Sequence, residues 1–218
     1  MSYSAPYGDI HEVYGLTVTS EPSEEPVTTS EAKQHLRVDT SDDDTYIDGL
    51  ITAARQHVEQ YLSRALVTTE YTMTLDHFSP YIAWWPVSMY SSTIYLPRAP
   101  VQSVDEIRYI DDGGTQQTLA SSRYRVDKTS LVARVTPAYA ETWPTTRPVT
   151  NAVEIDFTAG YGAATEVPKA IKQAILLLVG TMYDPVRADV VVGFTPEQMP
   201  FTAKSLLGPY RVATFPGS

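Results

Sequence analysis

The chain has 218 residues, of which 43% are hydrophobic, 26 are acidic and 16 are basic. This length and hydrophobic content allow a sizeable buried core in one or two domains. The sequence contains no cysteine, which excludes disulfide bonds and thiolate chemistry. The first residues have neither the basic nor the apolar region of a secretory signal, and we therefore expect assembly in a cytoplasm.

The net charge of −10 is concentrated at the start of the chain. Residues 1–63 hold 12 acidic and 3 basic side chains, a net of −9, and residues 64–218 hold the remaining 14 and 13, a net of −1. An acidic surface repels phosphate backbones, so we expect no tight or sequence-specific binding of nucleic acid. The acidity is typical of a solubilising surface, and it would also suit a passage through which DNA slides.

The N-terminal part predicts an extension followed by two helices. Residues 1–26 are rich in Ser, Pro, Glu and Tyr and lack a periodic apolar pattern, which predicts an acidic extension that is mobile unless a partner orders it. Thr28 and Glu31 have the spacing of a capping box, which predicts a short helix ending near Leu36. Three aspartates at 42–44 then precede apolar residues spaced by three and four, which predict an amphipathic helix through residue 63.

From Val67 the apolar period changes from 3.6 to 2, which predicts a strand up to Leu75. The turn sequence Asp-Asp-Gly-Gly at 111–114 predicts a hairpin. Together these features predict an antiparallel β domain, sandwich-like or barrel-like, within residues 67–162. Further strand-like runs lie at 93–96, 106–111, 115–119, 124–127, 131–135 and 152–158.

A strongly apolar helix is predicted from Pro168 to Asp184. Its apolar residues surround most of the helix, so they must be covered on several sides by this chain's own bundle or by neighbouring copies. Its longest unbroken apolar stretch, 174–179, is too short for a membrane span, which needs about 20 such residues. The packing candidates on this helix are Ile171, Ile175, Leu178, Val179 and Met182.

The order of these elements predicts an α+β protein in which a β domain is inserted into a small helical bundle. The bundle would consist of residues 27–66 and 163–185, and the β domain of residues 67–162. Residues 186–218 read either as a C-terminal docking tail or as a segment that folds back onto the bundle. The docking candidates in this tail are Phe201, Leu206, Leu207, Tyr210 and Arg211.

No pattern in the sequence indicates catalysis, and we expect no enzyme, no cofactor and no metal. The chain has no glycine-rich phosphate loop, nucleophile elbow or zinc-binding helix motif, and its four histidines are scattered. The aspartates at 42–44 are explained by the helix macrodipole more readily than by a cation. An aromatic group around Trp84 and Trp85 suggests core or interface packing, or alternatively a platform for a sugar.

Several stretches, in their order and spacing, resemble bacteriophage head–tail connector (adaptor) proteins. The resemblance covers about residues 27–211 and is closest to the long form of that family, in which a β domain interrupts the helical bundle. The N-terminal extension lies outside it. The stretches that carry the resemblance are 27–38, 42–44, 50–59, 96–104, 157–162 and 167–175.

The resemblance implies a structural virion protein of the neck. Such proteins form a ring, commonly of twelve copies, between the portal and the head-closure or tail-terminator proteins, and DNA passes through it. The C-terminal segment would reach toward the portal, and no membrane is involved. The alternatives are a carbohydrate-binding or protein-binding module of a phage tail or baseplate and, with less support, a metal-dependent nuclease using the aspartates at 42–44.

Overall fold

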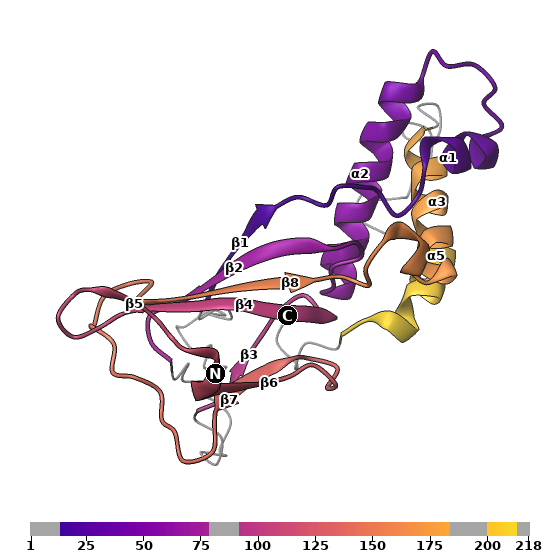
Figure 1. Ribbon diagram of the computed structural model, residues 1–218. Coiled ribbons are helices and arrows are strands. Elements are labelled where there is room, and N and C mark those ends of the chain that lie inside the picture. Colours follow the sequence, from indigo (N-terminus) through magenta and orange to yellow (C-terminus); the bar gives the residue numbers. More distant parts are fainter. Residues whose placement is uncertain (1–13, 79–91, 184–199, 213–218) are drawn as a thin grey trace, which may run out of the picture. The chain divides into compact units, whose positions relative to one another are not determined.

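The computed structural model describes residues 14–78, 92–183 and 200–212, which form two compact units. The first, here called the β unit, is built within residues 1–21 and 69–158. The second, the helical unit, consists of residues 22–68 and 159–212. Figure 1 shows the sheets of the β unit and the clustered helices of the helical unit. The chain is therefore an α+β protein.

The helical unit is assembled around one apolar helix. Its described α-helices are α1 (Thr29–Leu36), α2 (Asp44–Leu62), α3 (Lys169–Tyr183) and α5 (Phe201–Leu207). Helix α3 contacts each of the other three, so its apolar surface is covered within the unit. None of the described helices combines the length and apolarity that a membrane span requires.

The predicted capping box at the start of α1 is confirmed. The hydroxyl of Thr28 accepts the N–H of Glu31 at 3.2 Å, and the Glu31 carboxylate accepts the N–H of Thr28 at 2.8 Å. This second hydrogen bond is the main reason why the pKa of Glu31 lies below its ordinary value. The charged carboxylate is therefore favoured by the folded state.

The β unit contains two sheets. The larger has five strands in the order β1-β2-β8-β4-β5, and the smaller has three in the order β3-β7-β6. Strands β4 and β5 form the predicted hairpin, in which Gly114 has a φ of 85°. The strands are β1 (Gly15–Ser20), β2 (Thr69–Leu75), β3 (Ile94–Tyr95), β4 (Val101–Ile110), β5 (Gln116–Thr118), β6 (Tyr124–Asp127), β7 (Arg134–Pro137) and β8 (Val153–Ala159).

Strand β2 has the predicted alternation. Tyr71, Met73 and Leu75 are buried. Glu70 is exposed, and Thr72 and Thr74 are partly exposed. Strand β8 alternates in the same way, with Phe157 stacked on Tyr71 at a centroid distance of 5.4 Å. The apolar face of the larger sheet is thus the one that the sequence period indicated.

One strand lies where no strand was predicted. Strand β1 falls inside the expected N-terminal extension and pairs antiparallel with β2, with Leu16 opposite Met73 and Val18 opposite Tyr71. Apart from Leu16 its side chains are exposed, and its apolar alternation is limited to Leu16 and Val18, which is too short a pattern to predict a strand. Strand β7 is also displaced: it covers 134–137, whereas the apolar run predicted 131–135.

We expect Glu31→Gln to lower the stability of the helical unit by a few tenths up to about 1 kcal/mol at neutral pH. The folded-state pKa of Glu31 is depressed, so its contribution is present at neutral pH and is lost as the pH falls through that pKa. Thermal unfolding of both proteins between about pH 7 and pH 3 would test this. A difference that is unchanged at the acidic end would contradict it.

We expect Ile175→Ala to destabilise the helical unit by about 2–5 kcal/mol, because Ile175 is fully buried in its core. Gln173→Ala is the matched control, since Gln173 is exposed on the same helix and its loss leaves no cavity. Urea unfolding measures both free energies. Equal values for the two variants would show that α3 is not the centre of the core.

Candidate functional site

The C-terminal segment, where docking was predicted, folds onto the helical unit. Ala203 and Leu207 of α5 are fully buried and belong to the same apolar cluster as the core residues of α3. Leu206 and Tyr210 pack against that cluster and are partly buried. Phe201, by contrast, begins the helix with 85% of its surface exposed.

This placement corrects part of the docking prediction. Leu207 cannot contact a partner while it fills the core, because burial there removes its whole surface. The alternative, that the tail folds back onto the bundle, holds for α5 and the 3₁₀ turn η4 (Gly208–Tyr210). Of the apolar docking candidates, Phe201 is the one that the described structure leaves open to a partner.

Several polar contacts hold the end of this segment against α2. The N–H of Val212 donates to the carbonyl of Leu62 at 3.0 Å, and Arg64 Nε donates to the carbonyl of Tyr210 at 2.5 Å. The guanidinium of Arg211 lies over the ring of Tyr61, 5.2 Å from its centroid. Arg211, also predicted to dock, thus has a partner within its own chain.

The predicted packing candidates on α3 all lie in the core of their own unit. Ile171, Ile175 and Val179 are fully buried, and Leu178 is 4% exposed. Met182 is partly buried against the same cluster. These side chains therefore serve the bundle of this chain.

The aspartates before α2 connect helices. Asp43 accepts a hydrogen bond from the hydroxyl of Tyr183 at the end of α3, and Asp44 pairs with Lys33 of α1 at 2.6 Å. The bond to Asp43 raises the pKa of Tyr183 above its ordinary value, because it favours the protonated phenol. Within 14–78, 92–183 and 200–212, no group of three or more His, Asp or Glu is arranged to hold a metal.

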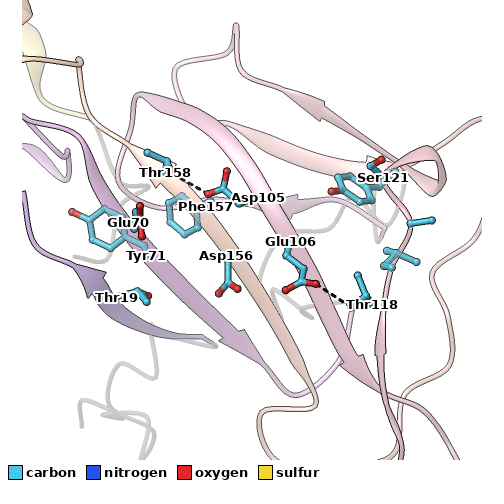
Figure 2. Close-up of a pocket in the computed structure, with 13 residues that line it drawn as sticks. Thr19, Glu70, Tyr71, Asp105, Glu106, Thr118, Ser121, Asp156, Phe157 and Thr158 are labelled. Atoms are coloured by element: carbon cyan, nitrogen blue, oxygen red, sulfur yellow. Dashed lines mark hydrogen bonds between the residues drawn. The ribbon is translucent and has the colours of Figure 1, made fainter.

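The β unit has a hollow of about 710 Å³ on its larger sheet, shown in Figure 2. Four carboxylates line it, from Glu70, Asp105, Glu106 and Asp156. Three of them already accept hydrogen bonds: Thr158 donates to Asp105 at 2.9 Å, for example, and Thr118 to Glu106 at 3.0 Å. No sequence motif pointed to this surface.

A chain of polar contacts crosses the strands beside this hollow. Arg108 of β4 and Thr72 of β2 both donate to Asp156 of β8, at 2.7 and 2.6 Å. Because the hydroxyl proton of Thr72 is used in that bond, Thr19 of β1 must be the donor in its 2.9 Å contact with Thr72. These contacts account for the polar face as cross-strand stabilisation.

The charged groups of the hollow are joined by ion pairs and hydrogen bonds across the strands. Arg108 also lies 3.2 Å from Glu154, so its positive charge is shared between the carboxylates of Glu154 and Asp156. The described lining contains neither a cysteine nor a histidine, and its hydroxyls at Thr118 and Thr158 donate to carboxylates that hold the sheet together. The aromatic group around Trp84 and Trp85 lies outside the described residues.

Residues 27–129 match the model of a family described as phage gp6-like head-tail connector proteins. Over this segment the chain is similar to the head–tail connectors. The matched segment begins at the capping box of α1 and extends through the hairpin of β4 and β5 to the end of β6. No curated protein sequence matches this chain significantly.

Solved structures share the fold of this chain along nearly its whole length. A chain from the neck of an empty gene transfer agent particle, computed with C6 symmetry, is 23% identical with a TM-score of 0.71, covering 94% of this chain and 98% of that chain. A chain from the native virion of such a particle has 23% identity and a TM-score of 0.69, with coverages of 93% and 98%. A chain from the native neck, computed with C12 symmetry, has 22% identity and a TM-score of 0.65, with coverages of 94% and 98%.

We expect Leu207→Ala to destabilise the protein by about 2–5 kcal/mol and Phe201→Ala to change its stability by no more than about 0.5 kcal/mol. The two residues lie in one helix, but Leu207 is buried and Phe201 is exposed. Chemical unfolding of the two variants compares them directly. Equal losses would show that α5 does not pack as described.

Proposed function

We propose that this head–tail connector forms a ring in the neck of a virion, between the portal and the head-closure or tail-terminator proteins. Its structural role follows from the family match over residues 27–129, which is the observation that carries the proposal. The agreement in fold with neck proteins along more than nine-tenths of the chain supports it. The protein would be assembled in the host cytoplasm and would act without catalysing a reaction.

The ring is proposed to contain twelve copies. Support comes from the C6 and C12 symmetries used for necks whose chains share this fold. A closed ring requires a head-to-tail interface, in which each copy presents two different surfaces to its neighbours.

The organisation proposed for the chain is one helical bundle, residues 27–66 and 163–185, interrupted by a β domain at 67–162. Support comes from the compact helical unit, whose two parts are separated in the sequence by the strands of the β unit. The two sheets of that unit would be the layers of a small sandwich. Residues 1–26 would be an acidic N-terminal segment that carries β1, and residues 186–218 a C-terminal segment that packs through α5 and presents Phe201 for docking.

Phe201 is proposed as the residue that anchors the connector to the portal. A phenylalanine with 85% of its surface exposed gains about 1.5–3 kcal/mol when a partner buries it. The helix that carries it is fixed by the buried Ala203 and Leu207, so little conformational entropy is lost on binding. Leu206, Tyr210 and Arg211 would support the segment on which Phe201 stands.

DNA is proposed to pass through the ring without specific binding. The net charge of −10 supports this, because carboxylates on the lining of a channel repel the phosphate backbone and prevent adhesion. A channel that binds DNA would instead need an excess of basic residues on its lining.

We expect Phe201→Ser to reduce attachment of the connector to portal-containing heads at least about tenfold, because the exposed ring would be lost from the interface. Tyr139→Ser is the matched control, since Tyr139 is 94% exposed but belongs to the β unit. Sedimentation of heads with labelled connector measures attachment.

Unchanged attachment of the Phe201→Ser variant would show that Phe201 does not lie in the interface with the portal. Absence of attachment by the unaltered connector, together with its absence from necks in electron micrographs, would contradict the proposed function itself.

A further inference from the structure

We propose that β1 is an exchangeable strand, and that in the ring residues 15–20 of one copy pair with β2 of the next. The interaction surface is the outer edge of β2, and its occupant is the β1 segment of a second copy. This inference rests on the proposed ring. It assigns a role to an N-terminal strand that the matched family segment, which starts at residue 27, does not include.

The first step is the nature of the β1–β2 contact. The two strands pair antiparallel from Gly15 opposite Thr74 to Ser20 opposite Glu70, with a register shift between Val18 and Ser20. A hydrogen bond between side chains joins Thr19 and Thr72 at 2.9 Å. All of these contacts are made by the backbone or by polar groups, so any chain with the same sequence can make them equally well.

The second step is that β1 contributes little to the core. Its residues are exposed except Leu16, which is partly buried, and Val18 has 42% of its surface exposed. Departure of the strand would therefore open no cavity. It would leave the edge of β2 with unpaired backbone groups, which favour pairing with another strand.

The third step is that the chain beyond β1 is held independently. The carboxylate of Glu25 accepts hydrogen bonds from Arg55 Nε and from the Thr52 hydroxyl, each at 2.8 Å. Glu24 accepts the N–H of Ala164 at 2.9 Å, and Val27 is 1% exposed. All these residues belong to the helical unit, so β1 can leave β2 while the connection behind it stays fixed.

The final step selects a second copy as the partner. The fit between residues 15–20 and β2 is already present in one chain, and exchange between identical copies preserves every contact in it. Neighbours in a ring are at high effective concentration, which lowers the entropic cost of exchange. The sequence Gly-Leu-Thr-Val-Thr-Ser also has no charged side chain or proline that would oppose intermolecular strand pairing.

A disulfide tests the exchange, because the chain has no cysteine of its own. A Cβ built on Gly15 lies 3.8 Å from the Cβ of Thr74, which is the mean separation in disulfides. We would prepare Gly15→Cys and Thr74→Cys as two separate proteins, mix them unfolded, refold and assemble them with portal-containing heads, and oxidise them. Non-reducing electrophoresis of the isolated necks would detect covalent dimers.

Exchange predicts disulfide-linked dimers in the mixed necks and none when either single variant is assembled alone. The double variant should give covalent multimers in necks and an internal disulfide when dilute. Necks that form normally but hold only internally bonded monomers of the double variant would overturn the exchange and leave the proposed function intact. Thr17→Cys with Thr72→Cys, also opposite in the register, repeats the test if the first pair fails to fold.

Discussion

The helical unit depends on the burial of α3. Its apolar residues extend around most of the helix, and a helix of that kind is stable in water only when neighbours cover it on several sides. Helices α1, α2 and α5 provide that cover within one chain. The fully buried Ile171 and Ile175 come from α3, Ile47 and Ile51 from α2, and Leu207 from α5. Burial of α3 therefore requires segments that lie more than a hundred residues apart in the sequence to fold together.

The connection between the two halves of the helical unit is equally constrained. Gly160 has a φ of 125°, and a side chain there would lie 2.4 Å from the carbonyl oxygen of Val67. Only glycine permits this approach, which allows Tyr161 to donate to Leu66 and Thr68 to donate to Gly162, both at 3.0 Å. The segment that precedes β2 and the segment that follows β8 are thereby paired, which holds residues 22–68 and 159–212 together in one unit.

Sequence periodicity predicted those elements whose side chains alternate between core and solvent. The capping box of Thr28, the amphipathic α2, the alternating β2 and the apolar α3 each have such a signal, and each is present. Strand β1 was missed because its apolar alternation is limited to Leu16 and Val18, and its other contacts with β2 are made by the backbone. Helix α5 was read as a tail because its contribution to the core, Ala203 and Leu207, is too short a pattern to predict a helix. The docking candidates were accordingly divided by tertiary packing, which left Phe201 exposed and buried Leu207.

A buried ionic network fixes the segment that connects β1 to the helical unit. Arg55 is only 5% exposed, and this burial alone would lower its pKa. The negative charges of Glu59 and Glu25 have the larger effect together, so the pKa of Arg55 lies above its ordinary value. Glu59 in turn accepts the N–H of Leu66 at 2.9 Å, at the exit toward β2. One arginine thus joins the segment that follows β1 to the segment that precedes β2. Loss of either carboxylate would leave a buried charge underpaired, which is more costly than replacing the whole network by apolar residues. The network fixes the geometry at this position, because the segment that follows β1 and the segment that precedes β2 are both bonded to it.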